Sequence, residues 1–227
     1  MKLLFLGDSL VALHNWQSRF PDHAPCNCGV AGETVAGLLA NLPFHLRRCP
    51  TPDRVFIMIG TNNLLREEYG FLPEYAAILD ILGSALPPAQ ITVTSLPPIR
   101  AAHLAPSVVP RLNEGLLQLS RQKKAAFLDL CSTFNTQAPD AAPCFAEDGV
   151  HFSDLGYTLW AAWIARFLQH FPFESRRFRT FPDAISDKFV TMGRSVSHNV
   201  HQTVRKTREK PCLKTTASPL TWPPCTK

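Results

Sequence analysis

The sequence has few of the features that mark a membrane protein. No window approaches the roughly 18–20 consecutive apolar residues of a membrane-spanning helix. An apolar run follows Lys2, but it ends after four residues, at residues 7–9 (GDS). The apolar core of a secretory signal peptide needs about 7–15 residues. We therefore expect a cytoplasmic protein.

The cysteines also lack the spacing of a metal site. The chain has seven, an odd number, and no CxxC motif occurs among them. Cys26 and Cys28 are separated by one residue, which matches no zinc spacing. We expect reduced thiols and no bound metal.

Most of the chain has no excess of positive charge. The formal net charge is +5, but residues 1–171 carry 12 Lys and Arg against 14 Asp and Glu. Residues 172–227 carry 11 against 4 and have few large apolar residues after Val204. The sequence therefore predicts a body with no affinity for nucleic acid and a poorly ordered basic tail, which we expect to make at most weak contact with anionic surfaces.

Short apolar runs alternate with amphipathic stretches throughout the body. Runs at 3–6, 54–59, 90–94 and 125–129, with a weaker one at 26–30, predict strands. Stretches at 33–48, 73–86, 109–124 and 153–170 have the apolar spacing of helices. This alternation predicts an α/β protein in which helices cover both faces of a parallel sheet.

Ser9 follows the first of these runs. Gly7 permits a sharp turn there, and Asp8 or Ser9 can cap a following helix. A serine in that place lies at the carboxyl end of a strand, where open α/β sheets bind ligands. It is a candidate nucleophile; an ordinary capping serine fits these residues equally well.

A serine nucleophile needs a base and a group that orients the base. Residues 148–151 (DGVH) supply both, because Asp148 can reach back to His151 across a glycine-containing turn. By themselves these residues also fit a plain turn that caps the last helix.

An acyl-transfer reaction also needs donors for the oxyanion. The candidates are the backbone N–H groups of Ser9 and Gly32 and the side-chain amide of Asn62. Gly32 can instead be a simple turn residue and Asn62 a helix cap. All of these candidates follow predicted strands or lie in loops at the same edge of the sheet.

Four sequence blocks together resemble the SGNH hydrolases, also called GDSL-type esterases and lipases. They are residues 7–10 (GDSL), 29–34 (GVAGET), 60–63 (GTNN) and 148–151 (DGVH), in the family's order. The last position of the third block is Asn63, where the family usually has Asp. We expect this difference to change local hydrogen bonding more than chemistry.

The resemblance implies a three-layer α/β/α sandwich with a five-stranded parallel sheet in flavodoxin-like order. The hydrolase domain would span residues 1–171 and the tail residues 172–227. The implied activity is hydrolysis of carboxylic esters without metal or cofactor. Ser9 would be the nucleophile, His151 the base and Asp148 its orienting acid. The N–H of Ser9, Gly32 and Asn62 would form the oxyanion hole.

The substrate is less constrained than the reaction. A short-chain or O-acetyl ester is favoured, since no long apolar insertion could shelter a fatty chain. The loop at 96–106, with Arg100 and His103, is a candidate pocket wall. Two alternatives remain: a lysophospholipase or acyl-thioesterase, and a non-catalytic scaffold that binds anionic partners through its tail. The sequence leaves the oligomeric state open.

Overall fold

The computed structural model describes residues 1–137 and 142–170. Its centre is a five-stranded sheet in the order β2-β1-β3-β4-β5, with every neighbouring pair parallel. The predicted α/β fold and its flavodoxin-like strand order are therefore confirmed. The strands are β1 (Lys2–Gly7), β2 (Ala24–Gly29), β3 (Arg54–Met58), β4 (Gln90–Thr94) and β5 (Ala126–Leu128).

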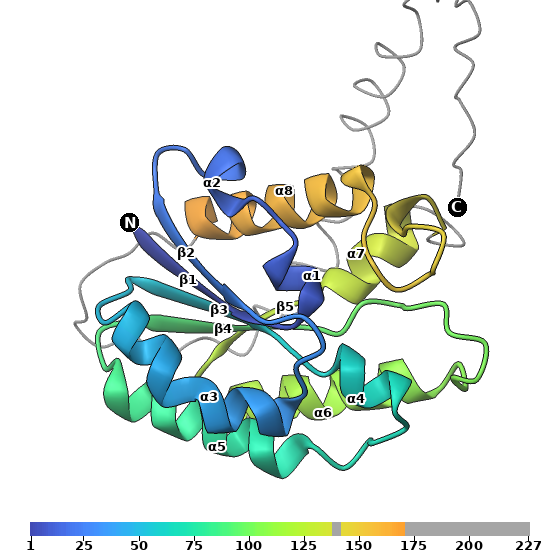
Figure 1. The fold of residues 1–227 in the computed structure, drawn as a ribbon, viewed down its shortest axis with the longest axis horizontal. Coiled ribbons are helices and arrows are strands. Elements are labelled where there is room, and N and C mark those ends of the chain that lie inside the picture. The colour runs from blue at the N-terminus through green and yellow to red at the C-terminus, as the bar shows by residue number, and fades with distance from the viewer. Residues whose placement is uncertain (138–141, 171–227) are drawn as a thin grey trace, which may run out of the picture. The chain divides into compact units, whose positions relative to one another are not determined.

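Helices cover both faces of the sheet. Figure 1 shows α3, α5 and α6 on one face, and α8 with α1, α2 and α7 on the other. The helices are α1 (Ser9–Ala12), α2 (Trp16–Arg19), α3 (Val35–Arg48), α4 (Thr61–Leu65), α5 (Leu72–Ala85), α6 (Val108–Gln122), α7 (Leu130–Gln137), the 3₁₀ turn η1 (Ala142–Cys144) and α8 (Asp154–His170).

The central strands are buried because both faces of the sheet are covered. Every residue of β3 is buried, as is every residue of β1 except Lys2. Continuous apolar runs suit this position, since neither face of the strand meets water. On the side of α2, the stacked rings of Phe5, Trp16 and Phe20 hold that short helix against β1.

The predicted helices differ little from those observed. Helix α3 continues through Pro43 to Arg48, so this proline does not end it. The region 10–20 contains two separate one-turn helices, α1 and α2. The sequence did not predict α4, α7 or η1. The predicted basic tail at 172–227 lies outside the described residues.

Within the described residues, no helix has both the length and the apolar character needed to cross a bilayer.

Candidate active site

The nucleophile candidate lies at the junction of β1 and α1. Ser9 is the first residue of α1. Asp8 caps this helix, because its Oδ1 accepts a hydrogen bond from the Leu10 N–H at 3.0 Å. A Cβ on Gly7 would stand 2.1 Å from the Met58 carbonyl oxygen of β3. Only glycine fits this close approach, which fixes the place where β1 turns into the helix.

Ser9, His151 and Asp148 form one hydrogen-bonded chain. Ser9 Oγ lies 3.0 Å from His151 Nε2, and His151 Nδ1 lies 2.6 Å from Asp148 Oδ2. The serine and the histidine are 142 positions apart in the sequence, so only the fold brings them together. This is the arrangement that a base needs to take the proton of a serine hydroxyl.

The turn that carries Asp148 and His151 is held by its own backbone. Ala146 donates its N–H to the His151 carbonyl at 2.8 Å, and Gly149 donates to the Ala146 carbonyl at 3.0 Å. The second oxygen of Asp148 accepts the N–H groups of Val150 and His151 at 2.9 Å each. The His151 side chain and the Val150 N–H lower the pKa of Asp148 to about 2, so it stays ionised.

The candidate oxyanion donors lie at the same edge of the sheet. Within the described residues, neither the Ser9 nor the Gly32 N–H donates to a protein acceptor. Asn62 Nδ2 donates to the Glu33 carbonyl at 2.8 Å, and this bond holds the amide beside Gly32. The amide keeps a second N–H for a substrate oxygen. The space in front of Gly32 is open, since a Cβ there would meet nothing within 4 Å.

Asn63 supports this arrangement from behind. Its Oδ1 accepts the buried Val35 N–H at 2.9 Å, so it ties the start of α3 to α4. Its Nδ2 donates to Glu68 Oε2 at 3.2 Å. An Asp carboxylate could accept the same hydrogen bond from the Val35 N–H. Asn63 therefore keeps this contact at a position where the SGNH hydrolases usually have Asp.

The model of the GDSL-like Lipase/Acylhydrolase family matches residues 5–159. This match covers the greater part of the chain and includes all four sequence blocks. The chain belongs to the GDSL-like lipase/acylhydrolase family. It is therefore a carboxylic ester hydrolase. Its substrates are small-molecule esters, the class on which this family acts.

Several solved structures of other proteins share the fold. A lipase/acylhydrolase from Enterococcus faecalis matches with a TM-score of 0.64 at 19% identity, covering 78% of this chain and 99% of the other. A variant of an acetyl xylan esterase from Geobacillus stearothermophilus gives 0.61 at 22%, covering 78% and 97%. A GDSL-like lipase from Bacteroides thetaiotaomicron gives 0.59 at 19%, covering 74% and 88%. A search of curated proteins gave no match.

A second carboxyl group of this GDSL hydrolase lies directly behind the nucleophile. Asp8 is fully buried, and burial raises its pKa to about 6. The N–H of Leu10 and the N–H and hydroxyl of Thr61 oppose this rise, as does the nearby His151. Burial outweighs these contacts because an ionised carboxylate loses most of its hydration there.

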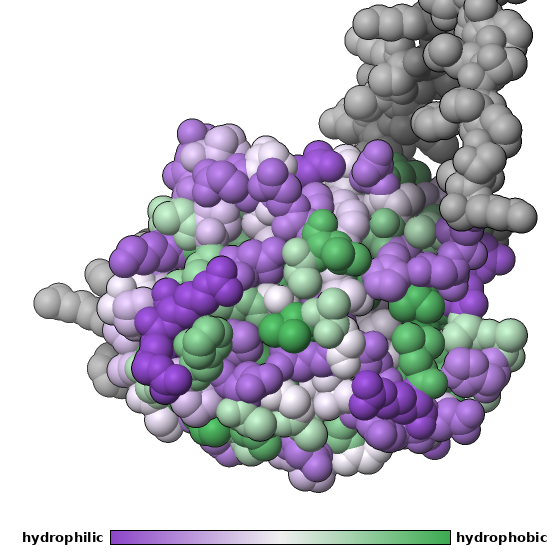
Figure 2. Space-filling model, in the orientation of Figure 1, coloured by the Kyte–Doolittle hydropathy of each residue, from purple (hydrophilic) through white to green (hydrophobic). Residues whose placement is uncertain are grey.

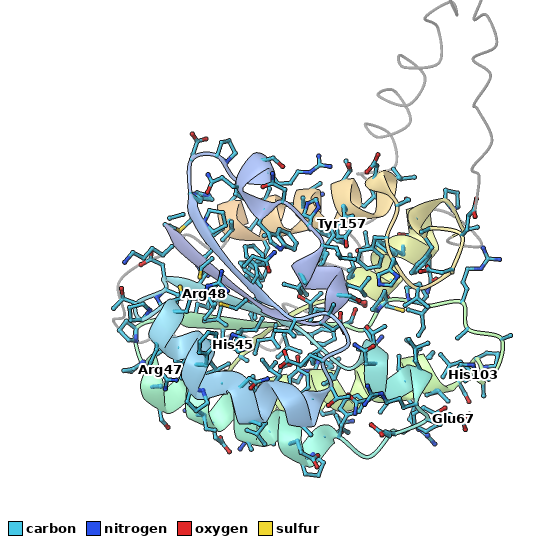
Figure 3. The ribbon with its side chains drawn as sticks, viewed as in Figure 1. His45, Arg47, Arg48, Glu67, His103 and Tyr157 are labelled. Atoms are coloured by element: carbon cyan, nitrogen blue, oxygen red, sulfur yellow. The ribbon has the colours of Figure 1, made fainter. Side chains whose placement is uncertain are left out.

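Further side chains that the sequence analysis did not identify hold α1 in place. The Tyr157 hydroxyl on α8 donates to the Leu10 carbonyl at 3.0 Å (Figure 3). Its ring stacks on His14 with centroids 4.2 Å apart. Asn27 Nδ2 lies within 3.2 Å of the carbonyls of Val11, Ala12 and His14. The one sequence feature that could have drawn attention to Asn27 is that it is a polar residue within a strand.

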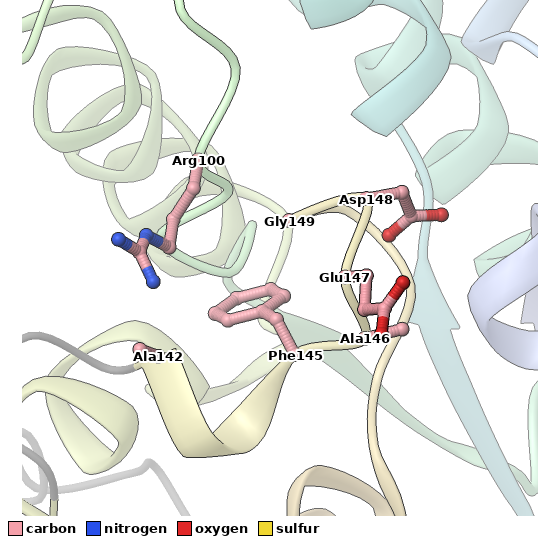
Figure 4. Close-up of a pocket in the computed structure, with 7 residues that line it drawn as sticks. All are labelled: Arg100, Ala142, Phe145, Ala146, Glu147, Asp148 and Gly149. Carbon is pink, nitrogen blue, oxygen red and sulfur yellow. The ribbon is translucent and has the colours of Figure 1, made fainter.

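A pocket of about 420 Å³ lies beside the Asp148 turn (Figure 4). Arg100 of the loop at 96–106 lines it, whereas His103 is exposed and does not. That this loop forms a wall of the substrate pocket stays a prediction. The other lining residues are Ala142, Phe145, Ala146, Glu147, Asp148 and Gly149.

Proposed function

We propose that this GDSL hydrolase cleaves short-chain or O-acetyl esters through an acyl-enzyme on Ser9. The observation that carries the proposal is the 3.0 Å separation of Ser9 Oγ and His151 Nε2. His151 accepts the hydroxyl proton at Nε2 while its Nδ1–H donates to Asp148. Because Asp148 remains ionised, it stabilises the imidazolium that forms.

The attack of Ser9 converts the ester carbonyl into a tetrahedral oxyanion. The N–H groups of Ser9 and Gly32 and the amide of Asn62 donate to this oxygen, where negative charge develops. His151 then gives its proton to the leaving alcohol, and the acyl group stays on Ser9. A water molecule, deprotonated by His151, attacks the acyl-enzyme and releases the carboxylic acid.

The proposed catalytic domain is residues 1–171, since all of these groups lie within it. One feature favours a short acyl group: Figure 2 shows apolar residues in small separate patches on the face in view. One protein of the same fold is named an acetyl xylan esterase, in keeping with an acetyl ester.

The test compares Ser9→Ala with Ser84→Ala, an exposed serine on α5. Turnover of 4-nitrophenyl acetate falls on the order of 10⁶-fold in Ser9→Ala and is unchanged in the control. With acetyl, butyryl, octanoyl and palmitoyl esters, kcat/KM of the unaltered protein is highest for the shortest chains. A maximum at palmitoyl would overturn the short-chain assignment, and full activity of Ser9→Ala would overturn the nucleophile.

A further inference from the structure

The turn that presents Gly32 is held at both of its ends. Val30 donates its N–H to the Gly7 carbonyl of β1 at 2.9 Å, and Glu33 donates its N–H back to the Val30 carbonyl at 3.2 Å. Gly32 has a φ of +78°, the left-handed value that the third residue of a type II turn requires. The direction of the Gly32 N–H therefore depends on where Val30 and Glu33 are held.

Glu33 is also joined to the second proposed oxyanion donor. Its carbonyl accepts the Nδ2–H of Asn62 at 2.8 Å. The N–H of Glu33 thus closes the turn at Gly32, while its carbonyl holds the amide of Asn62 beside that turn. A shift of Glu33 would displace both donors at once.

The Glu33 side chain is buried, which is uncommon for a carboxyl group. Only 6% of the residue is exposed. Its Oε1 accepts the Nδ2–H of Asn41 at 2.7 Å, whereas its buried Oε2 has no hydrogen-bond partner among the described residues. Burial raises the pKa of Glu33, and the hydrogen bond from Asn41 opposes this rise. An apolar side chain would avoid this desolvation. What the carboxyl group adds is the contact with Asn41.

That contact anchors the turn on a long helix. Asn41 lies on α3, eight positions after Glu33, so the Glu33 side chain runs along the start of this helix. A Cβ on Gly37 would stand 3.2 Å from Glu33 Cγ, so a side chain at residue 37 would press against it. Thr34 caps the same helix by accepting the Gly37 N–H at 3.2 Å. The carboxyl group therefore ties the turn to a part of the fold outside the site.

We propose that Glu33 is a positioning residue of the oxyanion hole and that Asn41 is its anchor. The carboxyl group holds residues 32–33 on α3, and this keeps the Gly32 N–H and the Asn62 amide directed at the oxyanion. Glu33 acts through these two donors and not on the substrate itself. The inference rests on the proposed function, since it assumes that Gly32 and Asn62 donate to the oxyanion.

The test removes the contact from each side, in Glu33→Met and in Asn41→Ala. Methionine fills the space of glutamate without accepting this hydrogen bond, and Asn41 is exposed, so its truncation leaves the core intact. Removal of an oxyanion donor costs about 10²–10³-fold in kcat. Here the donors are displaced and not removed, so kcat for 4-nitrophenyl acetate falls on the order of tenfold, with KM unchanged.

Two further variants test whether the contact itself is the cause. The double variant loses no more activity than either single variant, because all three lack the same hydrogen bond. Glu33→Gln keeps an acceptor for Asn41 and recovers most of the activity. Glu114 and Gln118 supply a matched control, since Gln118 Nε2 donates to Glu114 Oε1 at 3.0 Å on the exposed side of α6. Glu114→Met and Gln118→Ala change neither kcat nor KM.

A second measurement separates positioning from a general loss of structure. A trifluoromethyl ketone forms a tetrahedral adduct with a serine hydroxyl, and the oxyanion of this adduct occupies the same hole. Its inhibition constant rises in Glu33→Met and Asn41→Ala by the factor by which kcat falls, while the melting temperature of Asn41→Ala is unchanged. If Glu33→Met does not fold, Asn41→Ala decides the test.

Three results would overturn the inference while leaving the proposed function intact. Asn41→Ala keeps the original kcat, or Glu33→Gln loses as much activity as Glu33→Met. The third is that kcat falls while the inhibition constant of the ketone stays the same. If the unaltered protein does not hydrolyse 4-nitrophenyl acetate, the proposed function itself fails.

Discussion

The two turns that meet at His151 each carry an aspartate, and the protein shifts the pKa of these two groups in opposite directions. In the β1–α1 turn, Asp8 is fully buried and its pKa rises to about 6. In the turn at 146–151, half of the Asp148 side chain is exposed, and hydrogen bonds lower its pKa to about 2.

The difference shows how environment assigns roles to identical side chains. Asp148 receives three hydrogen bonds and meets water, so its charge is retained and can orient an imidazole. Asp8 caps α1 by accepting a hydrogen bond from the Leu10 N–H, but it is buried away from water, so its ionised form is unfavourable. We expect loss of the Asp148 charge to affect catalysis, and loss of the Asp8 charge to affect stability.

Among the changes that test this comparison, the largest effect is expected for Asp148→Asn. An amide can still accept the N–H groups of Val150 and His151, so the turn keeps its shape. It cannot stabilise an imidazolium or enforce the same tautomer, and kcat for 4-nitrophenyl acetate falls about 10⁴-fold. Asp22→Asn, at an exposed position before β2, is the matched control and keeps full activity. Equal rates in the two variants would show that Asp148 does not act through His151.

The second-largest effect is expected from removing one of the proposed oxyanion donors. Asn62→Ala removes an oxyanion donor and lowers kcat about 10²–10³-fold, with little change in KM. Because the Glu33 carbonyl also loses its partner, the melting temperature is measured alongside the kinetics. Asn135→Ala, on the exposed side of α7, changes neither quantity. A rise in KM with kcat preserved would place Asn62 in substrate binding and not in oxyanion stabilisation.

Asp8→Asn sharpens the comparison through stability. A carboxyl group whose pKa is higher in the folded state makes the protein less stable as pH rises from about 4 to about 6. The variant keeps an acceptor for the Leu10 N–H without this charge. At pH 8 it is therefore more stable than the unaltered protein by about 2–3 kcal/mol, and the difference disappears near pH 4.

Urea unfolding of both proteins at pH 4, 6 and 8 measures this difference. The same gap in unfolding free energy at all three values would show that the Asp8 charge is not its cause. A variant that is less stable at pH 8 would show that the contacts of the carboxylate with Leu10 and Thr61 outweigh its burial.

The smallest effect is expected from removing residues 172–227. All the groups proposed to act on the substrate precede this segment, so kcat/KM for 4-nitrophenyl acetate changes less than twofold. A larger loss, with the melting temperature retained, would extend the proposed catalytic domain beyond residue 171.

The fold followed from local pattern. Continuous apolar runs at 3–6 and 54–59 predicted the buried strands β1 and β3, and the regular alternation with amphipathic stretches predicted the parallel sheet. Helix α4 has five residues and α7 has eight, too short to show a repeating apolar face.

The positions of the site were more predictable than its energetics. The four sequence blocks located Ser9, Gly32, Asn62 and Asp148, because each follows a strand or lies in a turn. The raised pKa of Asp8 was not predictable, since it depends on how completely α1 and α4 exclude water. The contact of Arg100 with Gly149 joins two distant loops, so no local pattern indicates it.

Covalent labelling tests the central claim most directly. The protein is incubated with a fluorophosphonate, which reacts with an activated serine hydroxyl, and the modified peptide is mapped by mass spectrometry. The account predicts one adduct per chain, on Ser9, formed much more slowly in Asp148→Asn and absent in Ser9→Ala. An unlabelled Ser9 in the folded, unaltered protein, or an adduct on another serine, would contradict the account.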